Sequence, residues 1–103
     1  MLVFNTTYTM PNADARNFVI WAHQSYIPQA TDGGLLTKAR LLRVLSHKDE
    51  ETECFSLQFD VESSAVLHQW YSKTGCKLND EMMKLFDKRI VGFSTILEEI
   101  VGD

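Results

Sequence analysis

Several features that mark large classes of proteins are missing from this sequence of 103 residues. Its two cysteines, Cys54 and Cys76, lie far apart, and neither has a cysteine or histidine partner at metal-ligand spacing. The adjacent glycines Gly33 and Gly34 are not followed by the Lys-Ser/Thr of a phosphate-binding loop. No apolar run approaches the roughly 20 residues that span a bilayer, and the N-terminus lacks the pattern of a signal peptide. We therefore expect a cytoplasmic protein that needs no metal, cofactor or disulfide and does not bind a membrane.

The composition is that of an ordinary globular domain. The hydrophobic fraction is 45%, and the formal net charge is -4. A surface of this sign repels the phosphate backbone, so we expect no nucleic-acid partner. A chain of this length has room for one hydrophobic core, which predicts a single domain over residues 1–103.

Four segments are predicted to be β-strands, residues 2–10, 38–46, 52–60 and 90–97. Three of them alternate apolar and polar residues, whereas 38–46 is apolar on both sides except for Arg40 and Arg43. The pattern is clearest in the third, where Phe55, Leu57 and Phe59 alternate with polar or small residues. Helical periodicity lies between these strands. It predicts one helix from Asn12, as N-cap, to Pro28, and a second helical segment that begins at the N-cap Ser63.

The second helical segment is predicted to be split, because Gly75 suits a helix C-terminus and Asn79 suits the N-cap of a further short helix. The element order is then β-α-β-β-α-β, which predicts an α+β, ferredoxin-like sandwich. In this fold the helices cover one face of a four-stranded antiparallel sheet. Right-handed crossovers would put the first and third strands in the centre.

The sheet face that the helices leave uncovered, here called the open face, is predicted to mix small polar and aliphatic side chains. A face of this kind is too apolar to leave wholly in water, so we expect a homodimer in which two sheets stack. The residues expected on it are Asn5, Thr7, Thr9, Cys54, Ser56, Gln58, Ile90, Ser94 and Ile96, with either Leu42 and Val44 or Leu41 and Leu45.

Three runs of the sequence, residues 40–45 (RLLRVL), 55–59 (FSLQF) and 86–100 (FDKRIVGFSTILEEI), resemble an uncharacterised bacterial domain-of-unknown-function family of short single-domain proteins. The resemblance extends to Trp21 and the pair Ile27-Pro28. It implies a dimeric α+β barrel, a group that includes small monooxygenases, isomerases and stress-response proteins. Where relatives carry a histidine before Ile-Pro, this chain has Tyr26, and His23 lies one helical turn earlier.

Two sets of residues are candidates for a site. His23 and Tyr26 are neighbours on a helix and could form an acid/base pair, but we favour the simpler interpretation that they make the ordinary hydrogen bonds of an amphipathic helix. Arg40 and Arg43 differ in strand parity, so one of them should face the open face and could bind a carboxylate. The predicted ligand-binding set is Arg40, Arg43, Asn5 and Gln58.

These residues leave two hypotheses for function. The one we favour is a non-enzymatic homodimer of unknown role that could hold a small molecule or peptide between its two sheets. The alternative is a cofactor-independent monooxygenase or isomerase of the dimeric α+β barrel type, which would use His23, Tyr26 and one arginine. The two hypotheses differ in whether these ionisable groups meet at one cavity.

Overall fold

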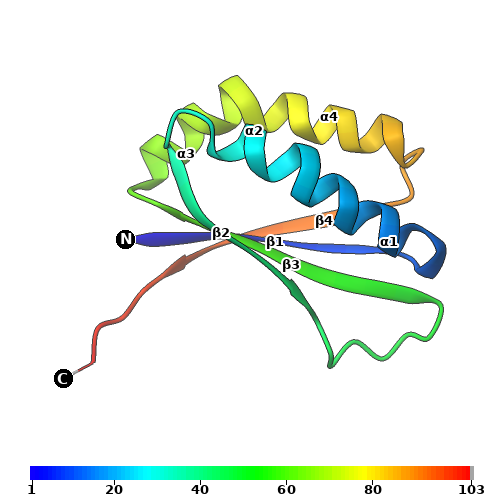
Figure 1. The fold of residues 1–103 in the computed structure, drawn as a ribbon. Coiled ribbons are helices and arrows are strands. Elements are labelled where there is room, and N and C mark those ends of the chain that lie inside the picture. The colour runs from blue at the N-terminus through cyan, green and yellow to red at the C-terminus, as the bar shows by residue number, and fades with distance from the viewer. Residues whose placement is uncertain (103) are drawn as a thin grey trace.

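The computed structural model describes residues 1–102 and has the predicted element order (Figure 1). The strands are β1 (Leu2–Pro11), β2 (Leu36–Arg43), β3 (Thr52–Val61) and β4 (Val91–Glu98). The first helix consists of α1 (Asn12–Trp21), the π-helical segment η1 (Ala22–Tyr26) and α2 (Ile27–Thr31). The second consists of α3 (Ser64–Trp70), the π-helical segment η2 (Tyr71–Gly75) and α4 (Cys76–Leu85).

The four strands form one antiparallel sheet in the order β2-β3-β1-β4, so β1 and β3 are central, as predicted. Both helices lie on the same face of this sheet (Figure 1). The core fills the layer between them, and Phe18 of α1 is at its centre. The Phe18 ring has four aromatic neighbours with centroids 5.1 to 6.3 Å away, from Tyr8, Trp21, Phe55 and Phe86. The fold is therefore the predicted ferredoxin-like sandwich.

The helix starts and stops differ from the predictions at four of five positions. Ser63 does cap its helix, and its hydroxyl accepts a hydrogen bond from the Val66 N–H at 3.2 Å. Asn12, however, is already inside α1, and its side chain donates instead to the carbonyl of Glu50 at 2.6 Å. Pro28 does not end the first helix, which continues to Thr31. The wider π-helical turn directly before Pro28 gives its ring room that a regular α-helical turn would deny.

The predicted break of the second helix at Gly75 and Asn79 is also wrong. Gly75 has a helical φ of -59°, and the helix runs through both residues. The glycine serves side-chain packing, because a Cβ at this position would lie 2.5 Å from Cζ3 of Trp70. The Trp70 ring is held there by a hydrogen bond from its Nε1 to the carbonyl of Ala30, 2.8 Å long, which links the second helix to the first.

Strand β2 begins and ends earlier than the predicted residues 38–46. A break in its register with β3 lies between Thr37 and Arg40, and Lys38 there has a φ of 52°. After this irregularity Arg40 lies opposite Gln58 and Leu42 opposite Ser56, both on the open face. Of the alternatives that the sequence left, the open face therefore carries Leu42.

The prediction for the last strand was wrong in its parity. Ser94 pairs with Thr6 and Ile96 with Phe4, which puts both on the helix side of the sheet, and Ile90 is buried in the core. The open face carries the alternate residues of β4 instead, and they are more apolar. They are Val91, Phe93, Thr95 and Leu97, of which Phe93 is 65% exposed.

An ion pair joins the start of α1 to the turn before β4. Arg89 donates from Nε and Nη2 to the two carboxylate oxygens of Asp14, at 2.8 and 3.0 Å. These hydrogen bonds lower the pKa of Asp14, against the opposing effect of its burial. Because the folded-state pKa is depressed, the stabilisation is present above the ordinary carboxyl pKa of about 4 and is lost as the pH falls through the folded-state value.

We therefore expect Arg89→Met to lower the melting temperature at pH 7 and to have progressively less effect below about pH 4. Arg16→Met is the matched control, since Arg16 is exposed on α1 and makes no ion pair within residues 1–102. The measurement is thermal unfolding of the three proteins from pH 7 to pH 2.5. A loss for Arg89→Met that stays constant over this range would show that the ion pair does not stabilise the fold.

Candidate functional site

A cavity of about 320 Å³ lies between the second helix and the half of the sheet formed by β1 and β4. Its volume is within the range of small-molecule sites, which begins near 300 Å³. The sheet side of the cavity is formed by Phe4, Thr6, Tyr8, Ile90, Gly92 and Ser94. The helix side is formed by Tyr26 of the first helix and by Trp70, Tyr71, Gly75, Asn79, Met82 and Met83 of the second.

Two glycines keep this space free of side chains. A Cβ on Gly92 would lie 3.2 Å from Cε1 of Tyr8, so the glycine lets the Tyr8 ring lie against the backbone of β4. Gly75 does the same for the Trp70 ring on the opposite wall. A glycine inside a strand usually marks a bulge or a close approach of another backbone, but here the register of β4 is unbroken and the group that lies close to Gly92 is the Tyr8 side chain.

Both π-helical segments contribute to the cavity. Tyr26 is the last residue of η1, and Tyr71 and Gly75 are the first and last residues of η2. A π-helical turn shifts the side chains that follow it around the helix axis, and such turns occur often at functional sites. Both π-helical turns therefore border the same cavity, which supports its assignment as the candidate site.

The polar groups of the cavity are neutral. Its lining contains no acidic or basic side chain among residues 1–102. Burial raises the pKa of Tyr8, with the neighbouring hydroxyls of Tyr26 and Thr6 opposing this effect. Burial and the proximity of Tyr8 raise the pKa of Tyr26. Both phenols therefore stay protonated at neutral pH and can donate hydrogen bonds, but neither can act there as a general base.

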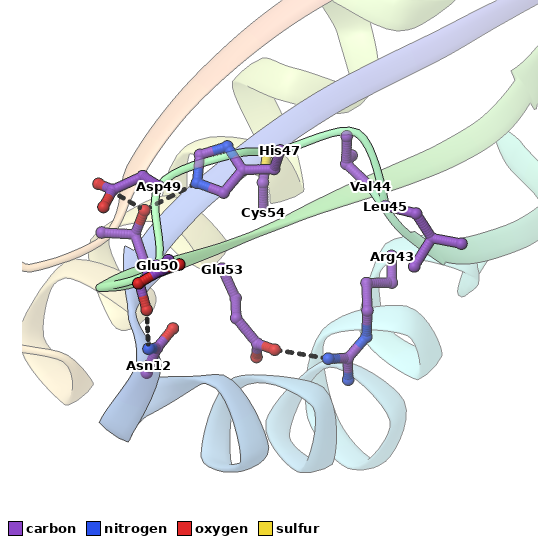
Figure 2. A pocket seen from close by; sticks show the side chains of 10 residues that line it. Asn12, Arg43, Val44, Leu45, His47, Asp49, Glu50, Glu53 and Cys54 are labelled. Carbon is purple, nitrogen blue, oxygen red and sulfur yellow. Dashed lines mark hydrogen bonds and ion pairs between the residues drawn. The ribbon is translucent and has the colours of Figure 1, made fainter.

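A second hollow, of about 380 Å³, lies under the loop between β2 and β3 (Figure 2). Its polar side chains are occupied with one another. Arg43 and Glu53 form an ion pair of 2.5 Å, and His47 Nε2 lies 2.7 Å from the hydroxyl of Thr52. The Arg43 guanidinium also lies 5.2 Å from the centroid of the Phe55 ring. These contacts hold the loop against β3, and we assign them a structural role.

The structure separates the side chains proposed for an enzyme, which were His23, Tyr26 and either Arg40 or Arg43. Tyr26 lines the cavity, whereas His23 is exposed and its Nδ1 lies 3.2 Å from the carbonyl of Val19. Arg40 is on the open face, and Arg43 is at the edge of the sheet near α1. Arg43 lines two hollows, one under the loop between β2 and β3 and one beside α1, and His23 lines neither of them.

The other predicted ligand residues lie together on the open face. Asn5 is opposite Gln58, which is opposite Arg40. Asn5 accepts a hydrogen bond from the hydroxyl of Ser56 and donates one to the hydroxyl of Thr95 at 3.2 Å. Gln58 donates to the same Ser56 hydroxyl at 3.3 Å. A polar chain thus runs across β4, β1 and β3.

The sequence held two signals for the cavity that were not used. Thr6 interrupts the inward-facing apolar row of β1, and its hydroxyl lies 3.0 Å from that of Ser94 on β4. Gly92 interrupts the apolar pattern of the last strand. Together they indicate that β1 and β4 do not contribute to a close-packed apolar core at these positions.

The family model described as "Domain of unknown function (DUF4286)" matches residues 1–100. The chain belongs to the DUF4286 family. No curated protein matches this DUF4286 chain in sequence. No helix within residues 1–102 is long and apolar enough to cross a membrane. In the same part of the chain, no group of three or more histidine, cysteine, aspartate or glutamate residues lies close enough together to hold a metal ion.

Solved structures similar to this DUF4286 protein share its fold at low sequence identity. A candidate antibiotic biosynthesis monooxygenase from Deinococcus radiodurans has a TM-score of 0.72 and 14% identity, covering 100% of this chain and 96% of that one. An ethyl tert-butyl ether degradation (EthD) family protein from Bacillus halodurans has a TM-score of 0.67 and 16% identity, covering 97% and 100%. A dimeric ferredoxin-like protein from an uncultured marine organism has a TM-score of 0.60 and 14% identity, with both chains covered completely.

Proposed function

We propose that this DUF4286 protein is a homodimeric binding protein that holds a small molecule in the cavity between its second helix and its sheet. The observation that carries the proposal is the cavity itself, with its volume of about 320 Å³. Its inner wall is made of buried aromatic side chains, and its buried hydroxyl groups come from Thr6, Tyr8 and Tyr26. An apolar pocket with a few converging polar groups is the usual form of a small-molecule site.

The homodimer is supported by the composition of the open face. Phe93, Val91 and Leu97 are 65%, 67% and 45% exposed in the single chain, and they lie beside the polar chain around Asn5. Stacking of two such faces would remove the apolar strip from water and leave the polar groups paired. A stable interface of this kind buries at least roughly 1,000 Å² in total. The solved dimeric ferredoxin-like protein shows that this fold is compatible with a dimer.

A second place for a ligand is the space between the sheets of such a dimer. Arg40 makes no ion pair within residues 1–102, and it lies in line with Gln58 and Asn5 across the open face. A ligand carboxylate or an acidic side chain of the partner subunit would complement it. We therefore propose Asn5, Arg40 and Gln58 as the residues that would contact a ligand between the two sheets.

Catalysis of the monooxygenase or isomerase kind has less support than binding. It needs a group that exchanges protons near neutral pH next to the substrate. His23 lies outside the cavity, and Tyr26 inside it keeps its proton. The likeness to a candidate monooxygenase is one of fold, and fold alone does not carry an activity.

Retention of small molecules from a metabolite extract tests the cavity. The protein would be equilibrated with the extract, separated by rapid gel filtration, and its bound compounds identified by mass spectrometry. We expect Gly92→Val to lose the compounds that the unchanged protein retains, at least tenfold, because the valine projects toward the cavity and displaces the Tyr8 ring.

The matched control is Gly102→Val, since a Cβ on Gly102 has no atom within 4 Å. This variant should retain the same compounds as the unchanged protein. Circular dichroism and melting temperature would establish that both variants are folded. Equal retention by a folded Gly92→Val would show that the bound compounds do not occupy this cavity.

A further inference from the structure

The cavity between the second helix and the sheet has a chemical character that restricts its ligand. Every polar side chain in its lining is a hydroxyl or an amide, from Thr6, Tyr8, Tyr26, Tyr71, Asn79 and Ser94. A charge moved from water into such a place needs an opposite charge or several strong hydrogen bonds to offset its lost hydration. The lining offers neither an ammonium or guanidinium group nor a carboxylate within residues 1–102.

The nearest long acidic side chain on the second helix is directed elsewhere. Glu81 accepts hydrogen bonds from Trp21 Nε1 at 3.0 Å and from the Ser25 hydroxyl at 3.3 Å, so its carboxylate joins the two helices. The acidic and basic residues that follow Phe86 lie in the turn before β4, where Arg89 is paired with Asp14. Glu81 and Arg89 are therefore engaged outside the cavity, and neither Asp87 nor Lys88 lines it.

The apolar part of the cavity favours a flat or compact ring. Phe4 and Trp70 lie edge to face with their ring centroids 5.9 Å apart, one from each wall. Met82 lines the same wall as Trp70, and its thioether adapts to the edge of an aromatic ring. Trp70, Met82 and Ile90 are nearly fully buried, so this end of the cavity is shielded from bulk solvent.

The polar part of the cavity can give and receive hydrogen bonds without carrying a charge. The hydroxyls of Thr6 and Ser94 lie 3.0 Å apart, and only one of them can donate to the other. Each hydroxyl oxygen also has lone pairs that can accept a hydrogen bond from a ligand. Tyr71, which is 43% exposed, lies where the cavity meets solvent, together with the exposed residues Asn79 and Ser94.

From this arrangement we propose that the cavity selects an uncharged ring compound that bears a hydroxyl or carbonyl group, and rejects anions and cations of the same shape. The ring would lie against Phe4 and Trp70, which contact each other edge to face, and the polar group would meet the hydroxyls of Thr6, Tyr8 and Ser94. This inference rests on the proposed function, since it names the class of molecule that the same cavity holds.

Three naphthalene compounds of matched shape test the selection by charge. They are 2-naphthol, which is neutral at pH 7, 2-naphthoate, an anion, and 2-naphthylmethylammonium, a cation. Their affinities would be measured by isothermal titration calorimetry with the full chain. We expect 2-naphthol to bind at least tenfold more tightly than either ion, and Gly92→Val to weaken its binding at least tenfold while Gly102→Val leaves it unchanged.

The possible outcomes separate this inference from the proposed function. Binding of either ion as tightly as 2-naphthol, and sensitive to Gly92→Val, would overturn the selection by charge and leave the cavity as a binding site. Binding of 2-naphthol that is insensitive to Gly92→Val would place it outside the cavity and overturn the inference. Failure of all three probes to bind would also overturn it, and the retention experiment would then decide the proposed function by itself.

Discussion

Replacing Phe18 by alanine should lower the free energy of unfolding by about 3–5 kcal/mol, the usual loss for a large aromatic side chain removed from a core. Phe18 is 1% exposed, and its ring has aromatic neighbours on β1, on β3, on α1 itself and at the end of α4. Because those neighbours belong to four different segments of the chain, they cannot all move inward to fill the space. Most of the space left by the phenyl ring should therefore stay empty, and its contribution to the loss of stability should remain.

Ile20→Ala is the control for Phe18→Ala, because Ile20 is on the same helix and 41% exposed. Its expected cost is within about 0.5–1 kcal/mol, as for most surface substitutions. Both values would come from chemical denaturation at a fixed protein concentration, since association would make stability depend on concentration. Equal losses in the two variants would mean that Phe18 is not the centre of the core.

Replacing Phe93 by glutamate should convert the proposed dimer to a monomer. Phe93 is 65% exposed on the open face and lies opposite Thr7 in the sheet. In a dimer with stacked sheets the variant would bury two carboxylates without partners, each at a cost of several kcal/mol. We expect the mass from light scattering at micromolar concentration to fall from that of two chains to that of one.

Leu85→Glu is the control for the dimer experiment. Leu85 is 57% exposed at the end of α4, on the helical layer and away from the open face. This variant should keep the dimer mass. A monomer mass for the unchanged protein would contradict the proposed dimer directly. A dimer mass for a folded Phe93→Glu would show that the interface lies on another surface.

The sequence was sufficient for the fold because its strongest signals are local and agree with one another. The alternation of Phe55, Leu57 and Phe59 identifies β3 and its buried face, and the order of strands and helices limits the topology to one common arrangement. The helix boundaries could not be read in the same way. Proline and glycine usually end helices, but Pro28 and Gly75 do not. The π-helical turn before Pro28 makes room for its ring, and the Trp70 ring occupies the space beside Gly75.

The candidate site was mostly invisible in the sequence because it depends on which side of a strand faces the helices. For β4, Ser94 was assigned to the open face, and the pairing of Thr6 with Ser94 shows that it faces the cavity. A shift of one residue moves every side chain of a strand to the other face. The cavity also needs Gly75 and Gly92, which are 17 positions apart in the numbering and meet only across two layers of the fold.

The fluorescence of Trp21 and Trp70 reports on the contact between the two helices. Each indole N–H crosses from one helix to the other, from Trp70 to the carbonyl of Ala30 at 2.8 Å and from Trp21 to the carboxylate of Glu81 at 3.0 Å. Separation of the helices breaks both hydrogen bonds and exposes both rings, which shifts their fluorescence emission to longer wavelength. Trp70 also lines the cavity, so a compound entering it changes the emission of one indole and leaves the other as an internal reference.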